Sequence, residues 1–420
     1  MEKYYLIKLL GGLLEMKKFL CLLLVFVFAF VLVGCGECDH NYVEGKCADC
    51  GKVFKIGLIC LHDESSTYDK NFIDSMNRAL VELGLDKSQL ELVVGIPEDD
   101  LCYAKATELA QTCDIVFADS FGHEDYVIQA AEENENVWFC HSTGTKAHTA
   151  DLDNYYNAFA SIYEGRYLAG IAAGMKLNEM IKNNEITAEE AIIGYVGAFP
   201  YAEVKSGYTS FFLGARSVCP TATMKVRFTT SWYDFDKEKT AAEALINVDK
   251  CVLISQHADS YGAPEACEAA GVPNVSYNGT TISQCPNTYV VSSKIDWTPY
   301  YVKMISAKLK GEKVAEKDYT GSLSTGSVKL DAVGSCAAEG TQAAIDAAAA
   351  QLKAGTLHVF DTSKFTVKGQ KLDSYLADVD DFGDFKPETE VVSDGYFHES
   401  EKRSAPYFDI DIDGIEILND

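Results

Sequence analysis

The sequence predicts an α/β protein built from parallel sheets with helices on both faces. A unit of buried strand, polar loop and amphipathic helix occupies residues 53–84. The same order of strand, loop and helix recurs three times, with the apolar runs at 114–118, 192–196 and 252–255 as its strands. Parallel strands need crossover helices, so this repetition favours doubly wound sheets. In such sheets ligands bind beyond the carboxyl ends of the strands, and the loops after these runs are where a site is expected.

Length and charge restrict the class of protein further. The 420 residues are too many for one ordinary hydrophobic core, so two domains are expected. The formal net charge of −27 disfavours nucleic acid, whose phosphates need an excess of Lys and Arg, and it equally disfavours anionic lipid surfaces. A neutral or cationic small ligand fits this charge better.

The amino terminus is typical of a bacterial secretory signal. A short positive region, Met16-Lys17-Lys18, precedes an apolar run at 19–33, which is short for a membrane span. The closing LVGC resembles the bacterial lipobox, which implies cleavage before Cys35 and lipid on its thiol. Residues 1–34 are therefore predicted to be a signal peptide, and an uncleaved anchor is the alternative.

Residues 35–54 are predicted to be a linker rich in cysteine and histidine. C-x-H followed by C-x-x-C is the ligand set of a small structural zinc site, formed here by Cys38, His40, Cys47 and Cys50. A metal-free spacer between membrane and domain is the alternative. A catalytic metal is not expected because the set leaves no open coordination position, and no cofactor is required.

Polar and aromatic residues follow the first predicted strands. Asp63 and Tyr68 lie in the loop after the first strand, where Tyr68 is a candidate for stacking on a ligand. Asp119, Ser120 and Phe121 open a later helix, whose free backbone amides would favour an acceptor group of a ligand. A solvated turn with an N-cap is the alternative for such polar residues. Glycine-rich phosphate motifs are absent from the sequence, so nucleotide phosphates are not expected.

From residue 156 onward the sequence contains runs that are specific enough to indicate a protein family. Residues 156–177 are predicted to be a helix in which Gly170 and Gly174 allow close packing. The run YEGRYLAGIAAG in this helix, preceded by FADSFGHEDYVIQAA and followed by IGYVGAFPYAEV, resembles the basic membrane protein family. These are substrate-binding lipoproteins of ABC transporters, of which the purine nucleoside receptors are best understood. The later runs TTSWYDFDKEKTAAEALI and VLISQHADSYGAPEACEAAGV resemble the branch that binds adenine-type purines.

The resemblance implies the type I periplasmic-binding-protein fold. Such proteins have two doubly wound lobes, a hinge that the chain crosses three times, and the ligand between the lobes. The expected division is lobe 1 at 55–155 and 282–345, lobe 2 at 156–281, and a C-terminal segment at 346–420 packing across the lobes. Within that segment, late strands are expected at 356–368 and 407–417.

The same resemblance implies how a purine would be held. Aromatic side chains clamp the ring in this family, and Tyr68, Phe199, Tyr201 and Trp232 occupy matching loops. The polar residues expected to read the ligand are Asp119, Ser120, Asp234, Gln256, His257, Asp259, Asn278 and Lys294. The family commonly has an aspartate near Asn278, so this position departs from its pattern. Packing inside one lobe is the alternative for each aromatic ring.

The sequence therefore predicts a lipid-anchored extracytoplasmic receptor that closes on an adenine-like base or nucleoside and delivers it to an ABC permease. Closure would be a hinge motion that the ligand favours by preferring the closed state. A second reading keeps the fold but binds a sugar, amino acid or signalling molecule, because carbohydrates also stack on rings. An exported nucleoside hydrolase is a third, although the sequence shows neither a clustered metal site after the first strand nor a nucleophile motif.

Overall fold

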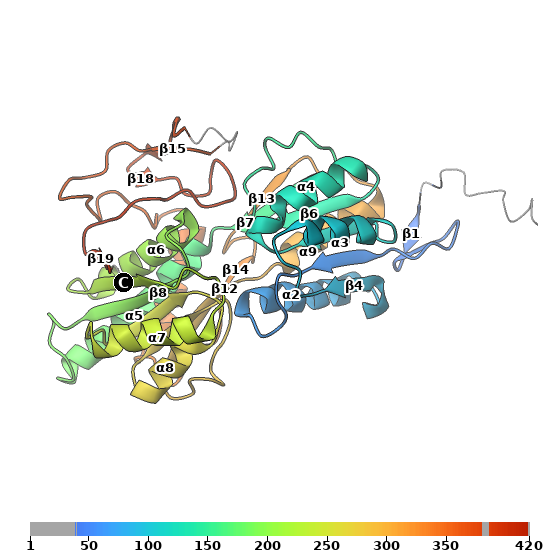
Figure 1. Cartoon of the computed structure of the whole chain (residues 1–420). Coiled ribbons are helices and arrows are strands. Elements are labelled where there is room, and N and C mark those ends of the chain that lie inside the picture. Colours follow the sequence, from blue (N-terminus) through green and yellow to red (C-terminus); the bar gives the residue numbers. More distant parts are fainter. Residues whose placement is uncertain (1–37, 39, 380–385, 419–420) are drawn as a thin grey trace, which may run out of the picture. The chain divides into compact units, whose positions relative to one another are not determined.

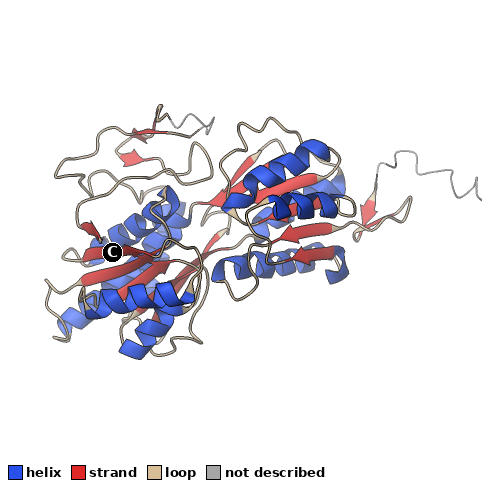
Figure 2. Ribbon diagram, viewed as in Figure 1, coloured by secondary structure: helices blue, strands red, loops and turns tan. Residues whose placement is uncertain are grey.

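A computed structural model of the chain describes residues 38, 40–379 and 386–418. The predicted signal peptide and Cys35 lie outside these residues. The chain separates into two compact units, residues 1–53 and 54–420, and the larger unit carries the α/β architecture (Figures 1 and 2). Within the described part, every helix is too short or too polar to cross a membrane.

The first lobe is built on a six-stranded parallel sheet of order β13-β7-β6-β5-β3-β4. Its strands are β3 (Ile56–Ile59), β4 (Leu90–Val93), β5 (Ile115–Ala118), β6 (Trp138–Ser142), β7 (Tyr155–Ala160) and β13 (Asp318–Gly321). Strands β3 and β5 are buried along their whole length. Continuous apolar runs of this kind predict strands covered on both faces, as is observed.

Two pairs of helices cover this sheet (Figure 1). Helices α2 (Thr67–Leu83) and α9 (Thr298–Lys310) pack together on one face, and α3 (Asp100–Ala110) and α4 (Glu124–Glu133) pack together on the other. Neighbouring residues of β5 point to opposite faces of the sheet. The ring of Phe117 lies 4.7 Å from that of Tyr301 in α9, whereas Val116 joins the core formed with α3 and α4. The short 3-10 helices are Lys87–Gln89 and Phe121–His123.

The second lobe is built on a seven-stranded sheet of order β14-β12-β11-β10-β8-β9-β19, in which only β14 runs antiparallel to its neighbour. Its strands are β8 (Ile192–Gly197), β9 (Thr223–Phe228), β10 (Leu253–His257), β11 (Asn274–Tyr277), β12 (Tyr289–Ile295), β14 (Val328–Leu330) and β19 (Ile415–Ile417). Helices α5 (Ile162–Lys182) and α6 (Ala202–Val218) pack together, as do α7 (Phe235–Asn247) and α8 (Gly262–Ala270). Helix α10 spans Thr341–Lys353.

Helices α5 and α6 approach so closely that only glycine fits at their crossing. A Cβ atom at Gly170 would lie 2.0 Å from the carbonyl oxygen of Phe211, and one at Gly214 would lie 2.0 Å from that of Tyr167. At Gly174 it would lie 2.4 Å from the carbonyl oxygen of Ala215. The close packing expected at Gly170 and Gly174 is therefore confirmed.

Arg166 of α5 is fully buried against the second sheet. Its guanidinium donates to Ser255 Oγ at 2.6 Å and to Tyr195 Oη at 3.1 Å. It also donates to the carbonyl oxygen of Ser276 at 3.2 Å and to Ser293 Oγ at 3.3 Å. These partners lie on β8, β10, β11 and β12, so one side chain joins α5 to four strands of the sheet.

Three expectations about element boundaries were wrong. The helix expected from residue 156 begins at Ile162, because the aromatic run YYNAFA forms the buried strand β7 instead. Residues 282–345 are divided between the lobes, since β12 and β14 join the second sheet while α9 and β13 belong to the first. Of the expected late strands, the sheet includes only β19.

The rest of the C-terminal segment is held by side chains. Phe360 and Phe408 stack with ring centroids 4.4 Å apart, and both are buried. Its regular elements are two pairs of two-residue strands, β15 (Leu376–Ala377) with β16 (Thr389–Glu390) and β17 (Val392–Ser393) with β18 (Tyr396–Phe397). Apolar spacing in this segment therefore marks a small aromatic core rather than long strands.

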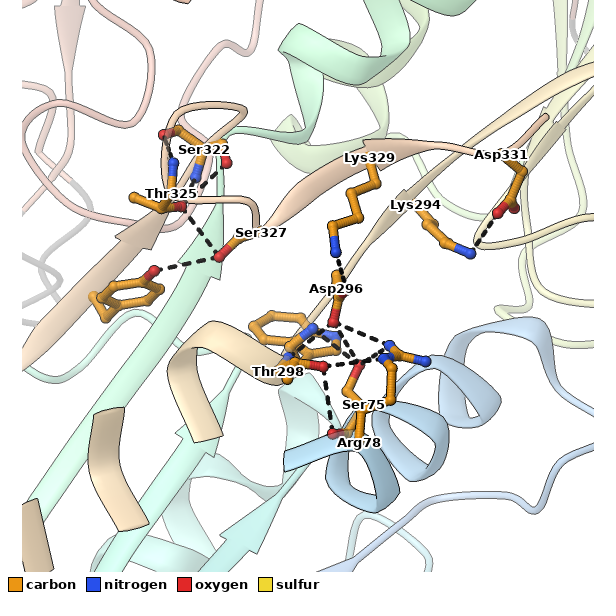
Figure 3. A network of polar contacts seen from close by, with 12 residues as sticks. Ser75, Arg78, Lys294, Asp296, Thr298, Ser322, Thr325, Ser327, Lys329 and Asp331 are labelled. Atoms are coloured by element: carbon orange, nitrogen blue, oxygen red, sulfur yellow. Dashed lines mark hydrogen bonds and ion pairs between the residues drawn. The ribbon is translucent and has the colours of Figure 1, made fainter. Parts of the chain in front are cut away.

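The chain passes between the two sheets three times, which confirms the two-lobe fold. The crossings lie between β7 and α5, between β12 and α9, and between β13 and β14. Figure 3 shows the polar groups around the second and third crossings. In the third, the backbone N–H of Ser322 donates to Thr325 Oγ1 at 2.8 Å, and Thr325 Oγ1 donates to Ser327 Oγ at 3.2 Å.

Asp296 is the central acceptor of the second crossing (Figure 3). Its carboxylate accepts from Arg78 Nη2 of α2 at 3.0 Å and from Lys329 Nζ of β14 at 2.6 Å. It also accepts from the backbone N–H of Thr298 at 3.0 Å, at the start of α9. Burial opposes its ionisation, but the bonds from Lys329, Thr298 and Arg78 outweigh burial and hold the pKa of Asp296 well below its usual range.

We expect Asp296→Asn to lower the free energy of unfolding by about 2 kcal/mol at neutral pH, because hydrogen bonds to charged groups contribute about 1.5–3 kcal/mol. A depressed carboxyl pKa stabilises the fold above the ordinary value of about 4, and this stabilisation is lost as the pH falls below it. The difference in Tm between variant and wild type should therefore shrink below about pH 4. Asp74→Asn, which alters an exposed pair with Lys70, is the control. A difference of the same size at every pH would contradict the assignment.

Candidate ligand-binding cleft

A cavity lies between the lobes and, with the adjoining open solvent, contains about 440 Å³ of empty space. Its wall includes residues that follow β3, β5, β6, β10 and β11, so it lies at the carboxyl ends of both parallel sheets. The lining residues are Leu61, His62, Tyr68, Asp69, Ser120, Phe121, Thr143, Glu203, Trp232, His257, Asp259, Tyr277 and Asn278. The cavity therefore occupies the place where the topology predicts a ligand.

The two lobes touch each other beside this cavity. The backbone N–H and hydroxyl of Thr67, at the start of α2, donate to the carbonyl oxygen of Asp259 at 3.0 and 3.2 Å. Asn71 Nδ2 donates to Asn278 Oδ1 at 3.4 Å. The rings of His62 and Tyr233 lie 5.3 Å apart. Direct bonds between the lobes are what a closed cleft requires.

Aromatic rings from both lobes reach the cavity. Tyr68 of the first lobe is fixed by its hydroxyl, which donates to the carbonyl oxygen of Asp119 at 2.7 Å. Trp232 of the second lobe packs edge-on against Phe199 at 5.4 Å, and Phe199 stacks on Tyr201 at 5.1 Å. The backbone of Trp232 is fixed as well, because its carbonyl accepts from the N–H of Asp259 at 2.9 Å.

The space continues into an adjoining cavity that is partly open to solvent. Tyr201 and Trp232 line it together with Arg403, Ala405 and Pro406 of the C-terminal segment. That segment is bonded to both lobes, since Ser404 Oγ donates to Asp318 of β13 at 2.6 Å and Lys205 of α6 pairs with Asp409 at 2.8 Å. The C-terminal segment thus forms part of the wall.

Two buried carboxyl groups, Asp69 and Asp119, meet at the first-lobe wall, and Asp69 lines the cavity. Asp69 accepts from the backbone N–H of His62 at 2.7 Å and lies 3.4 Å from His62 Nδ1. Burial raises the pKa of Asp69, but the bonds from His62 and Ser66 outweigh it, so the net shift of this pKa is downward. Burial and then the charge of Asp69 raise the pKa of Asp119 well above its usual value. Asp119 Oδ2 is buried with no hydrogen-bond partner among the described residues.

We expect Asp119→Asn to become more stable than wild type as the pH rises. A carboxyl whose pKa is raised in the fold holds a proton that the unfolded chain has released, so stability falls between the two pKa values. The amide has no proton to lose and can still accept from the backbone N–H of Leu61, which lies 3.1 Å from Asp119 Oδ1. Thermal unfolding from about pH 5 to 9 measures the effect.

Asp119→Ala is the comparison for this prediction, because it leaves the Leu61 N–H unpaired and should destabilise the fold at every pH, by about 1–3 kcal/mol. If Asp119→Asn instead lost stability relative to wild type as the pH rose, Asp119 would be an ionised group in the fold.

The second-lobe wall also carries acidic groups. Asp259 accepts from Asn278 Nδ2 at 3.1 Å, and burial followed by the charges of Glu238 and Asp69 raises its pKa well above the usual value. His257 Nε2 lies 3.4 Å from Glu203 Oε1, while burial lowers the pKa of the imidazole. The described residues that line this cavity include no Lys or Arg. The site therefore concentrates hydrogen-bond acceptors without a cation to balance them.

Several of the predicted site residues line the cavity, namely Tyr68, Ser120, Phe121, Trp232, His257, Asp259 and Asn278. Asp119 lies beneath it, and Phe199 and Tyr201 support Trp232. The amides expected to be free at the helix start after Asp119 are not all available. Glu98 accepts from the backbone N–H of Gly122 at 2.8 Å and from Ser120 Oγ at 2.6 Å.

The other predicted residues lie elsewhere and have local structural roles. Asp234 caps α7 by accepting from the N–H of Lys237 at 3.0 Å, and Asp63 accepts from the N–H of Ser65 at 2.9 Å in an exposed turn. Gln256 Oε1 accepts from Asn274 Nδ2 at 3.0 Å inside the second sheet. Lys294 forms an ion pair with Asp331 beside the hinge (Figure 3). The N-cap interpretation therefore describes Asp234 better than ligand recognition does.

The lining residues that were not among the predicted site residues are Leu61, His62, Asp69, Thr143, Glu203 and Tyr277. Leu61, His62 and Thr143 lie within three residues of the end of a strand, and Tyr277 ends one, which is a usable sequence signal. Glu203 lies at the start of α6 within GAFPYAEV, where an acidic residue also satisfies the helix dipole. Only its position opposite His257 distinguishes it.

Comparison with known families gives a match over most of the described chain. Residues 56–353 match the profile of the family described as ABC transporter substrate-binding protein PnrA-like. A purine-binding protein of Brucella abortus is 30% identical over 362 residues, which cover 81% of this chain and 97% of that protein. A candidate ABC transporter glucose-binding protein of Haloferax volcanii is 33% identical over 252 residues, covering 60% of each chain.

Solved structures show the same fold. An ABC transporter solute-binding protein from Conexibacter woesei superposes with a TM-score of 0.60 at 19% identity, covering 73% of this chain and 98% of that one. One from Aeropyrum pernix gives 0.59 at 13% identity, covering 73% and 93%. At these identities the similarity concerns the fold alone.

Proposed function

This chain belongs to the PnrA-like family of ABC transporter substrate-binding proteins, and we propose that its own ligand is a purine, either an adenine-like base or its nucleoside. In this proposal the purine is held in the cleft between the lobes and passed to a permease of the same transporter. The observation that carries the proposal is the acidic, aromatic lining of a cavity at the carboxyl ends of both sheets.

The acidic lining favours a ligand that offers hydrogen-bond donors. Asp259 and Glu203 lie on the second-lobe wall and Asp69 on the first, and the described lining includes no Lys or Arg. An ionised carboxylate accepts hydrogen bonds only. The exocyclic amine and ring N–H of a purine are donors, and a donor placed at Asp259 would favour its ionised form. A phosphate would be repelled by this wall, so a base or nucleoside fits better than a nucleotide.

The aromatic rings favour a flat ligand. Tyr68 and Trp232 reach the cavity from opposite lobes, and each is fixed through a hydrogen bond to the residue or loop beside it. Stacking of a base on an aromatic side chain contributes about 1–3 kcal/mol per base. A purine lying between rings of the two lobes would also favour the closed state, because it would contact both lobes only there.

The proposal includes the cellular location of the protein. Substrate-binding proteins of ABC importers work outside the cytoplasm, and residues 1–35 have the form of a signal peptide followed by a lipid-modified cysteine. Lipid on Cys35 would keep the receptor beside its permease. Intact-mass spectrometry of the chain purified from a bacterial membrane should show an N-terminal Cys35 carrying acyl groups, and an unmodified or uncleaved N-terminus would refute the anchor.

The proposed ligand can be tested on the full chain in detergent by thermal unfolding and titration calorimetry. Adenine, guanine, hypoxanthine, their nucleosides, adenosine monophosphate and glucose would each be added. A ligand that binds only the folded state stabilises it by about 2.7 kcal/mol at a hundredfold excess over Kd. We expect stabilisation by a purine base or nucleoside and none by the monophosphate. Stabilisation by glucose alone, the alternative suggested by the Haloferax relative, would refute the purine.

Trp232→Ala identifies the cavity as the place of binding. We expect it to weaken purine affinity about tenfold or more, corresponding to the lost stacking, while the Tm without ligand changes little. Tyr103→Ala, which removes a partly buried ring from α3 in the first lobe, is the aromatic control and should keep the affinity. Unchanged affinity in Trp232→Ala would place the purine elsewhere.

A further inference from the structure

The smaller unit of the chain, residues 1–53, holds a cluster of soft ligands in its described part. The side-chain ligand atoms of Cys38, His40, Cys47 and Cys50 all lie within 4.8 Å of one another. Cys38 and Cys47 approach with their sulfurs 3.7 Å apart, and Cys50 Sγ lies 3.4 Å from His40 Nδ1. We propose that these four side chains bind one zinc ion that folds this unit.

The distances match a tetrahedral zinc site. Zinc binds cysteine sulfur at about 2.3 Å and histidine nitrogen at about 2.0–2.1 Å. A regular tetrahedron with those bonds separates two sulfurs by about 3.8 Å and a sulfur from a nitrogen by about 3.5 Å. The separations of 3.7 and 3.4 Å agree with both values. A disulfide would require sulfurs at about 2.05 Å and would account for only two of the four groups.

The backbone holds the ligands in the form of a metal-binding turn. The hairpin of β1 (Tyr42–Val43) and β2 (Lys46–Cys47) places Cys47 at its end, and the backbone N–H of Gly51 donates to the carbonyl of Cys47 at 2.9 Å. Gly51 has φ +78°, a conformation that glycine adopts without strain.

Without a metal this unit has little to hold it together. Among its described residues, Gly45 and Cys47 are the buried ones, so it lacks an apolar core. Two paired strands of two residues each are too short to be stable alone. Residues 35–53, which follow the predicted signal peptide, fall well below the length of about 40 residues under which a unit usually needs disulfides, metals or association to fold. A closed site with four protein ligands serves a structural role, because zinc keeps no position open for a substrate.

Zinc content and proteolysis of the full chain, purified in detergent with a reductant, test the proposal. We expect about one zinc per chain by elemental analysis, and close to none in the double variant Cys47→Ser with Cys50→Ser. Replacing the zinc with Co²⁺ should give the sulfur-to-metal charge-transfer and visible bands of tetrahedral thiolate ligation. Trypsin should cleave after Lys46 and Lys52 much faster once the metal is chelated.

Cys336→Ser, which removes a partly buried cysteine of the larger unit, is the matched control and should retain the zinc. Purine binding should be the same in the double variant as in wild type, so failure of the zinc proposal and failure of the purine proposal are separate results. The proposal is overturned if the reduced chain retains neither zinc nor cobalt, if Cys336→Ser loses as much metal as the double variant, or if Cys38 and Cys47 are found as a disulfide.

Discussion

The buried guanidinium of Arg166 is the constraint on which the second lobe depends. A charge away from water is costly unless its donors are bonded. Here Nη1 and Nη2 bond to hydroxyls and a carbonyl on four strands, whereas Nε has no partner among the described residues. The same guanidinium lies 5.4 Å from the ring centre of Tyr277, which lines the cleft. Arg166 therefore links the packing of α5 to the shape of the ligand cavity. The glycines at the crossing of α5 and α6 serve the same arrangement from the other side, by letting α6 lie close to α5.

The acidic groups in the cleft, unlike Arg166, are buried without enough partners. Asp119 and Asp259 are buried without a Lys or Arg among the described lining residues, and their pKa values are raised in consequence. A fold selected only for stability would pair or replace such groups. The retention of Asp259, which lines the cavity, is understandable if a ligand supplies a further donor, because the unfavourable burial would then be relieved on binding. Perturbed carboxyls in a cleft are a recognised mark of a functional site.

The sequence predicts the fold well where local pattern and burial agree. Strands such as β3 and β5 are covered on both faces and so appear as continuous apolar runs, and the glycines of α5 indicate close packing directly. About half of the residues that line the site could be predicted, since residues that follow parallel strands must lie along the same edge of a sheet. Hydrogen bonds between particular side chains and backbone groups could not be predicted from the sequence. The sequence does not distinguish the helix-capping Asp234 from an aspartate that binds a ligand, whereas the structure shows that Asp234 accepts from the N–H of Lys237. Likewise, the sequence does not show that Glu98 accepts from the backbone N–H of Gly122, which was expected to be free for a ligand. The C-terminal segment has no clear period, so its contribution to the wall is also hidden.

Asp259 shows how recognition and closure can be one event. Its N–H donates to the carbonyl of Trp232, its own carbonyl accepts from Thr67 of the opposite lobe, and its carboxyl accepts from Asn278. One residue thus fixes the aromatic wall, joins the two lobes and presents an acceptor to the cavity. A ligand donor that engaged the carboxyl would stabilise the loop that makes the contact with Thr67. The hinge at Asp296 connects the same lobes at the crossings, where its partners come from α2, α9 and β14. Closure would then be set by polar contacts beside the cavity, at Asp259 and Asn278, together with those of Asp296 at the hinge.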